Sequence, residues 1–335
     1  MAVGRFNSRL TALRTACLLC LTFTLYTFTP VAQAEQELIA IGGGLVGGTF
    51  NAFATGISDY LRNEFPQYNV IVESSSGSAE NIRQLQGGEL EMAIAFAGDA
   101  YLAANQRETF DDQVYDKIRA VGFLYGAVSQ LVVLESSEIR TWGELAGRRI
   151  ALGAAGSGTH LSIERLLRHT GLLDSITPVL VGGQASSDAL KDGQVSAYHA
   201  LLGVPNATVT DTSTTADIVI LSTYAVAQAS GFFEEFPFYE HAVIPAGTYR
   251  GVDENIDTWQ DAGIWVVSAD LSDEVVYEMT RAVYSQAGLD YLQRVTEAAR
   301  DMNRANAMSG IVIPLHPGAA RFWQEAGVAL PNAGR

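Results

Sequence analysis

Residues 38–50 constrain the fold of this chain more than any other stretch. A short apolar run at residues 38–41 leads into five glycines between positions 42 and 48. The run is too short for a helix and is typical of a buried strand, whereas Phe50, Phe53 and Ile57 recur at helical spacing. The pattern predicts a strand, a glycine turn and a helix, whose first N–H groups and partial positive charge suit an anionic ligand.

The same turn also fits a dinucleotide site. Gly42, Gly44 and Gly47 satisfy the G-x-G-x-x-G fingerprint, and Glu73 ends the next apolar run, where a ribose-binding acid can stand. The N-terminal segment weighs against this alternative, because it predicts a compartment that holds no pool of reduced nicotinamide cofactor.

Residues 1–34 have the three parts of a secretory signal peptide. Three arginines precede an apolar segment at residues 15–30, and Ala-Gln-Ala at 32–34 fits a cleavage site. A membrane anchor is the alternative, but the apolar segment is shorter than the ~20 residues that span a bilayer. We expect cleavage after residue 34, a periplasmic location and no direct membrane insertion afterwards.

Cleavage would change both the cysteine content and the charge. Cys17 and Cys20 leave with the signal peptide, outside a convincing lipoprotein sequence, so the mature chain has no thiol or disulfide. Loss of three arginines takes the formal net charge from −16 to −19, with Lys117 and Lys191 as the only lysines. Nucleic acid and anionic membranes are poor partners for such a surface. No cofactor is predicted, and no residue is assigned as a metal ligand.

The order of the next elements predicts a parallel sheet. Strands at 69–73 and 91–96 flank a helix that starts in Ser-Ser-Ser-Gly-Ser and stops at 87–88. This β-α-β-α-β order places ligands at the carboxyl ends of the strands. A strand at 149–153, a glycine turn and a helix then repeat the pattern at an offset of roughly 110 residues.

Long apolar runs predict the connections between the two similar halves. Residues 120–134 and 261–269 are expected to be strands that cross from one half to the other. Two helices are predicted at 272–287 and 290–304, and a short one around 321–325. Two facing halves would bring both glycine turns to one cleft.

Catalytic motifs are missing from the sequence. It holds no G-x-S-x-G, H-E-x-x-H or P-loop motif, so no catalytic residue is assigned and an enzyme is not expected. His169, His199, His241 and His316 are interpreted as capping or structural, whereas His160 lies on the second glycine turn and could face the cleft.

Small polar residues stand at three helix starts beside glycines. One such start would be ordinary N-capping. Two in one half and one at the corresponding place in the other favour a shared anion site, which binds a carboxylate through N–H groups and hydroxyls without an arginine. The side chains concerned are Thr49, Ser76, Ser78, Asn81, Ser157 and Thr159.

Five stretches resemble the TAXI-type solute-binding proteins, the extracytoplasmic subunits of a class of TRAP transporters. They lie at residues 41–50, 76–85, 145–159, 244–251 (Ile-Pro-Ala-Gly-Thr-Tyr-Arg-Gly) and 313–319 (Ile-Pro-Leu-His-Pro-Gly-Ala). The last two are specific, since no common fold requires them. The resemblance covers nearly the whole mature chain, in the family's order.

The resemblance implies an α/β fold of the type II periplasmic-binding class, with two α/β lobes joined by crossing strands around a ligand cleft. Lobe I would comprise residues 35–130 and 263–335, and lobe II residues 131–262. It also implies a monomer that delivers a small organic acid or amino acid, such as 2-oxoglutarate or glutamate, to TRAP membrane permease subunits. The ligand-binding residues expected by position are Gly47, Thr49, Phe50, Ser76, Gly77, Ser78, Asn81, Asp99, Tyr125, Ser157, Gly158, Thr159, His160, Gly203 and Asn206.

Three departures from the family pattern bear on the ligand. Phe50 stands where the family often has tyrosine, Ala97-Gly98 where it often has Gln-Ser, and Gly126-Ala127 where it often has Pro-Glu. The last two remove candidate partners for an amino group, and a buried ammonium without an acceptor is costly. We therefore expect a ligand without an α-ammonium, such as a dicarboxylate or oxo acid, although Asp99 and Glu73 could replace the lost acceptors.

Several alternatives remain open at the level of sequence. The ligand could be an amino acid such as glutamate, and the permease could be of the ABC type. The chain could also be a periplasmic sensor that presents its liganded form to a signalling receptor, or an enzyme on a Rossmann-like sheet.

Overall fold

The computed structural model of the chain describes Met1, residues 36–107 and residues 113–331. The predicted signal peptide, including Cys17 and Cys20, lies outside the described residues. Among the described residues, no helix combines the length and the apolarity that a membrane crossing requires.

The first half of the fold follows the predicted order. β1 (Glu37–Gly42) leads through the glycine turn into α1 (Thr49–Glu64), followed by β2 (Tyr68–Glu73), α2 (Ser78–Gly87) and β3 (Met92–Phe96). β1 pairs in parallel with both β2 and β3, so the order across the sheet is β2-β1-β3. Gly88, in the left-handed region at φ 77°, ends α2 as predicted.

A helix follows β3 where the sequence suggested only the end of a strand. α3 (Ala97–Ala104) begins at once after Phe96 and buries Ala97, Ala100 and Ala103. The alanines favour a helix, but eight mostly small residues give only a weak amphipathic pattern. Gly98 allows the helix to lie against Phe238, because a Cβ there would be 2.4 Å from that ring.

The second half repeats the first, which confirms the predicted internal repeat. It contains β5 (Arg149–Ala151), α4 (Gly158–His169), β6 (Thr177–Val179), α5 (Gln184–Lys191) and β7 (Ala197–Leu202). β5 pairs in parallel with β6 and β7, giving β6-β5-β7 in the sheet. The remaining elements of this half are α6 (Ala207–Thr215), β8 (Ile218–Leu221), α7 (Tyr224–Ser230), α8 (Phe232–Glu235) and β9 (Glu240–Ile244).

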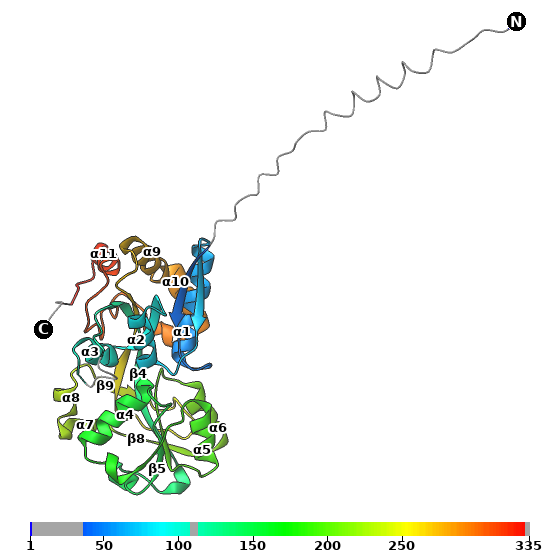
Figure 1. Cartoon of the computed structure of the whole chain (residues 1–335). Helices are drawn as coiled ribbons and strands as arrows, with labels where there is room; N and C mark the ends of the chain where they lie inside the picture. The colour runs from blue at the N-terminus through cyan, green and yellow to red at the C-terminus, as the bar shows by residue number, and fades with distance from the viewer. Residues whose placement is uncertain (2–35, 108–112, 332–335) are drawn as a thin grey trace. The chain divides into compact units, whose positions relative to one another are not determined.

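Two long antiparallel strands, β4 (Ile118–Leu134) and β10 (Ile256–Ser268), join the halves (Figure 1). β4 leaves β10 and joins β7 at Val128, and β10 passes from β9 to β3 between Gln260 and Gly263. The described part of the chain thus forms one ten-stranded sheet shared by two α/β lobes. The predicted α/β fold with two lobes and crossing strands is confirmed, whereas the lobe limits at 130/131 and 262/263 stay a prediction.

The C-terminal helices return to the first half. α9 (Asp273–Val283) packs on α11 (Pro317–Glu325), and α10 (Gln286–Val295) packs on α1. The break between α9 and α10 comes earlier than predicted, because the Ser285 hydroxyl caps α10 by accepting a hydrogen bond from the Gly288 N–H. Short 3-10 turns complete the elements at Glu135–Ser137, Trp142–Leu145, Leu173–Ser175 and Glu297–Asp301.

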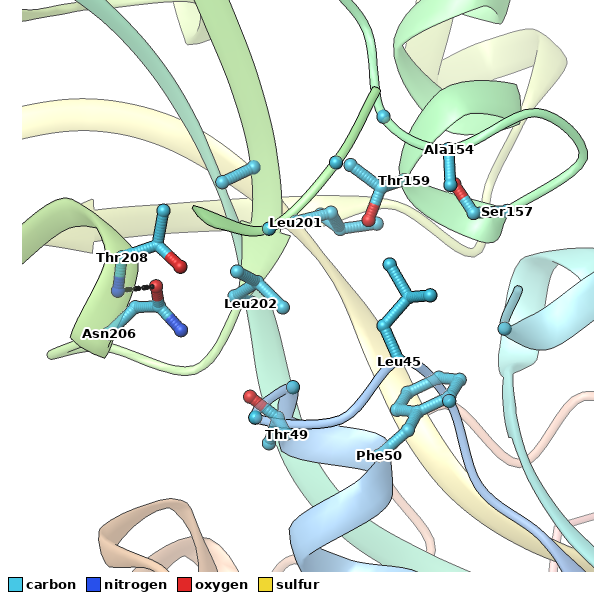
Figure 2. A pocket seen from close by; sticks show the side chains of 18 of the residues that line it. Leu45, Thr49, Phe50, Ala154, Ser157, Thr159, Leu201, Leu202, Asn206 and Thr208 are labelled. Carbon is cyan, nitrogen blue, oxygen red and sulfur yellow. Dashed lines mark hydrogen bonds between the residues drawn. The ribbon is translucent and has the colours of Figure 1, made fainter. Parts of the chain in front are cut away.

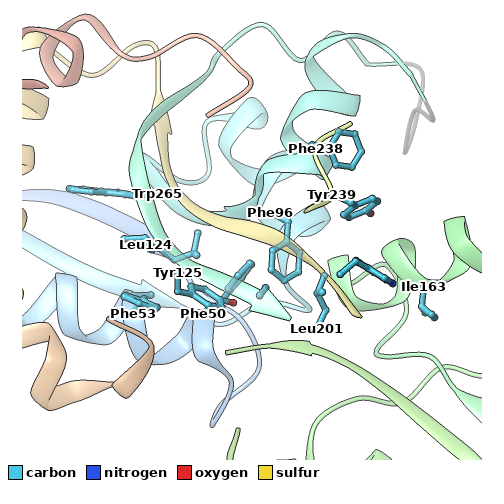
Figure 3. Packing of buried hydrophobic residues seen from close by; sticks show 14 of the residues in the cluster. Phe50, Phe53, Phe96, Leu124, Tyr125, Ile163, Leu201, Phe238, Tyr239 and Trp265 are labelled. Carbon is cyan, nitrogen blue, oxygen red and sulfur yellow. The ribbon is translucent and has the colours of Figure 1, made fainter. Parts of the chain in front are cut away.

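The hydrophobic core is continuous through both halves. Phe53 of α1 stacks on Tyr125 of β4 at 5.3 Å between ring centroids, and Phe50 lies 4.7 Å from Phe96 (Figure 3). Residues of α4 in the other half belong to the same cluster. The aromatic stretch at 232–239 extends it, with Tyr239 packed 4.8 Å from Trp259.

Candidate ligand-binding pocket

A pocket of about 430 Å³ lies between the two halves, with walls from both. Among the described residues, five helices begin at its wall: α1 and α2 from the first half, and α4, α5 and α6 from the second. This convergence follows from the topology, because helices after parallel strands start at the strands' carboxyl ends. The positive ends of five helix dipoles are therefore directed at one volume.

Three of these helices leave their first N–H groups without a side-chain cap from any described residue. α1, α2 and α5 have glycine at the N-cap, at Gly48, Gly77 and Gly183. By contrast, Ser157 Oγ accepts from the His160 N–H at 3.1 Å on α4, and Asn206 Oδ1 accepts from the Thr208 N–H at 2.8 Å on α6 (Figure 2). Uncapped helix starts are natural sites for carboxylate oxygens.

The glycine at position 77 brings the two halves into contact. Its φ of 124° is a conformation that side chains rarely adopt, and a Cβ there would lie 3.7 Å from Ser157 Cβ of the opposite half. The two predicted polar helix starts therefore meet across the pocket.

Most of the predicted ligand-binding residues line this pocket. Those in the lining are Gly47, Thr49, Phe50, Ser76, Gly77, Ser78, Tyr125, Ser157, Gly158, Thr159 and Asn206. Their role as ligand contacts stays a prediction.

Asn81, His160 and Gly203 lie outside the lining and have other partners. The Asn81 amide donates to the Gly43 carbonyl at 2.6 Å and to the Ile94 carbonyl at 2.7 Å, so it fixes the first glycine turn against β3. His160 Nε2 lies 2.8 Å from Glu164 Oε2 on its own helix. At Gly203, a Cβ would approach Ala298 Cβ to 3.1 Å, so close packing accounts for the glycine.

Asp99, also outside the lining, belongs to a buried ion pair between the halves. Its Oδ1 accepts from Arg165 Nη2 of α4 at 2.8 Å, while Arg165 Nη1 donates to Tyr239 Oη at 2.9 Å. Asp261 Oδ1 accepts from the Gly98 N–H at 3.2 Å, and burial, reinforced by the charge of Asp99, raises the pKa of Asp261 well above its usual value. No local pattern predicts this pair, since Arg165 stands on a helix among other charged residues.

His199 is a pocket residue that sequence reasoning interpreted as structural. It lies on β7, lines the pocket and places Nε2 3.0 Å from Ser129 Oγ. Burial lowers its pKa to about 3, which keeps the ring neutral at pH 7. Its place towards the carboxyl end of the third strand of the second repeat was the signal that could have found it. Other lining residues that were not predicted include Leu45, Phe96, Gln184, Leu201, Leu202 and Asp211.

The pocket offers many hydrogen-bond donors but little charge. Within the described chain, no lysine or arginine lines it, and Asp211 is its one ionised side chain. Lys191 Nζ lies 2.9 Å from Asp211 Oδ2 and neutralises it. Two buried polar atoms of the lining, Tyr125 Oη and His199 Nδ1, have no well-formed hydrogen bond to any described residue. Unpaired groups of this kind are costly unless a ligand or water satisfies them.

Across residues 36–107 and 113–331, no three histidine, cysteine, aspartate or glutamate side chains are grouped so that they could hold a metal ion.

Known structures resemble the chain at low sequence identity. A protein from Bordetella bronchiseptica RB50 aligns with a TM-score of 0.51 and 16% identity over 90% of this chain and 92% of its own, which shows a shared fold. The alkanesulfonate-binding protein SsuA from Xanthomonas axonopodis pv. citri gives 0.48 and 16% over 88% and 92%. A Listeria monocytogenes protein assigned as an L-cystine ABC transporter gives 0.49 and 14% over 80% and 98%.

A family model identifies the chain more directly. The model described as the NMT1-like family matches residues 41–327, from the first glycine turn to the end of the last helix. The match does not reach the finer TAXI assignment. The chain belongs to the NMT1-like family.

Proposed function

We propose that this protein captures a small organic carboxylate between its two lobes outside the cytoplasm and delivers it to a membrane permease. The observation that carries the proposal is the convergence of five helix starts on one pocket, three of them with glycine N-caps. Hydroxyls of Thr49, Ser78 and Thr159 add donors beside these N–H groups. A carboxylate can be bound by such groups without an arginine.

The finer proposal is a ligand without an α-ammonium. Of the two acids that could have accepted an ammonium, Asp99 is paired with Arg165, and Glu73 is exposed and outside the lining. Asp211 is held by Lys191 and by Gln184 Nε2, at 2.9 Å from each. A dicarboxylate or oxo acid, of which 2-oxoglutarate is the example implied by the TAXI resemblance, is therefore favoured over glutamate.

The permease in the proposal is of the TRAP type. The support is the TAXI-like motifs at 244–251 and 313–319. An ABC permease is the alternative, and reconstitution with either permease separates them, since TRAP transport follows an ion gradient and ABC transport follows ATP. A sensor would instead bind a signalling receptor in its liganded form.

Thermal unfolding tests the binding function. Protein collected from the periplasm of an expression host, then unfolded and refolded to remove carried-over ligand, is heated with oxo acids, dicarboxylates and amino acids. A ligand at 100 times its dissociation constant adds about 2.7 kcal/mol of stability, which raises the melting temperature visibly. We expect shifts with acids that lack an ammonium. Absence of any shift across the panel would contradict carboxylate capture.

A further inference from the structure

The middle of the pocket is apolar. Leu45 and Phe50 from the first half face Leu201 and Leu202 from the second (Figure 2). Phe96 closes the same wall and is 4% exposed. Leu45 lies on the first glycine turn, and 44% of its surface is exposed. It therefore presents apolar surface that a ligand in the pocket can cover.

Within the described lining, no full cation is available to pair a second carboxylate at the apolar middle of the pocket. Helix starts supply partial charges of about +0.5 each. The one acid in the described lining, Asp211, is already paired with Lys191 at 2.9 Å. A second carboxylate placed against Leu201 and Leu202 would lose its water without gaining a partner, which is costly.

The size of the pocket points the same way. At about 430 Å³ the pocket can enclose an acid with an apolar body, and ligand pockets of roughly 300–1,000 Å³ are lined mostly by hydrophobic side chains. Two buried atoms of the lining, Tyr125 Oη and His199 Nδ1, form no well-aligned hydrogen bond within the described chain, although the Thr49 hydroxyl and the Thr159 backbone lie close to them. They are available to a polar head group.

We infer that the ligand is a monocarboxylate with an apolar body. The carboxylate lies at the helix starts, and the body lies between Leu45 and Phe50 on one side and Leu201 and Leu202 on the other. This inference rests on the proposed carboxylate capture and narrows the ligand class: it keeps oxo acids with an apolar body and replaces the dicarboxylate 2-oxoglutarate as the best example.

Calorimetric titration with four acids of similar carbon chain length tests the inference. The probes are 4-methyl-2-oxopentanoate, 2-oxoglutarate, L-leucine and L-glutamate, which vary the head group and the far end independently. We expect 4-methyl-2-oxopentanoate to bind at least tenfold more tightly than 2-oxoglutarate, and leucine more tightly than glutamate. Equal or tighter binding of 2-oxoglutarate would overturn the apolar-body inference and leave carboxylate capture intact. Binding of none of the four would count against both.

A charge placed on the apolar wall gives a second test. Leu45→Lys adds a cation at an exposed position of the lining, and we expect it to invert the preference toward 2-oxoglutarate. Leu38→Lys is the matched control, because Leu38 is 56% exposed on β1 and outside the lining. The control should bind all four acids as the parent protein does. An unchanged preference in Leu45→Lys would contradict the placement of the ligand's body beside Leu45.

Discussion

Tyr125 is a side chain whose position lowers the stability of the unliganded protein and favours ligand binding. Its ring is fully buried against Phe53, yet its hydroxyl forms no well-aligned hydrogen bond within the described chain, although the Thr49 hydroxyl lies close by. A buried hydroxyl without a partner costs about 1–3 kcal/mol. A ligand oxygen in the pocket would recover that free energy on binding.

Replacing Tyr125 by phenylalanine should therefore affect stability and affinity in opposite directions. We expect the melting temperature of unliganded Tyr125→Phe to be equal to or above that of the parent. We expect its affinity for the bound acid to fall about tenfold or more, since hydrogen bonds to charged groups contribute ~1.5–3 kcal/mol. Tyr198→Phe is the control: Tyr198 Oη bonds Thr212 Oγ1 at 2.9 Å, so this variant should lose stability and keep its affinity. Lower stability of Tyr125→Phe with unchanged affinity would refute a ligand-facing role.

Asp261 makes stability depend on pH. Its folded-state pKa lies above the unfolded value of 3.8, so between these two pKa values the folded chain binds more protons than the unfolded chain. The free energy of unfolding must then fall as pH rises through that window. Asp261→Asn keeps an oxygen that can accept from the Gly98 and Ala262 N–H groups and cannot ionise.

We expect the melting temperature of Asp261→Asn to match that of the parent near pH 4 and to exceed it increasingly as the pH rises toward 8. Asp257→Asn, on the same strand but exposed, should show no such divergence. A variant that is less stable than the parent at pH 8 would show that the ionised carboxylate is favourable in the fold.

The ion pair between α3 and α4 links two helices that are distant in the sequence. Asp99 and Arg165 are 1% and 5% exposed, and they join the first half to the second beside the pocket. A buried pair of this kind adds little net stability, but removal of one partner leaves an uncompensated charge.

Arg165→Met should lower the free energy of unfolding by about 3–5 kcal/mol in denaturant titrations. Addition of Asp99→Asn should recover part of that loss, because the buried charge disappears. Arg168→Met changes the exposed arginine of the next turn, whose pair with Glu164 is worth less than ~1 kcal/mol. No difference between the Arg165 and Arg168 variants would rule out the helix-linking role.

The elements that could be predicted from sequence are those with a strong local signal. β1, the glycine turn and α1 follow from apolar spacing and five glycines within seven residues, and the repeat placed the second turn opposite the first. α3 lacked such a signal, because its buried face is made of alanines. The Asp99–Arg165 pair and the apolar wall at Leu201 depend on how two distant segments pack, which no local pattern encodes.

Because the pocket has walls from both halves, ligand affinity depends on how closely the two halves approach each other. Each half contributes helix starts to the pocket, and β4 and β10 are the strands that connect them. A ligand that contacts both walls stabilises the arrangement in which they are close together, through its higher affinity for that arrangement. Substitutions that keep the halves apart should therefore weaken every ligand alike.

Gly158 is the position where that approach is tightest. A Cβ there would be 2.3 Å from Phe96 Cδ2 and 2.7 Å from Asp99 Oδ2, both on the opposite half. Its backbone lies at the start of α4 outside the left-handed region, so alanine suits the helix itself. Gly158→Ala should therefore destabilise the contact between the halves and leave the internal packing of each half unchanged.

We expect Gly158→Ala to lower the melting temperature of the unliganded protein, because the added Cβ disturbs Phe96 and the Asp99–Arg165 pair. We also expect it to bind all acids about tenfold more weakly or worse, and to retain a larger radius of gyration by small-angle scattering when ligand is added. Gly143→Ala is the matched control, since a Cβ at Gly143 meets nothing within 4 Å. Parent-like affinity in Gly158→Ala would mean that capture does not require the halves to close at α4. An affinity loss confined to one acid would instead place Gly158 in direct contact with that ligand.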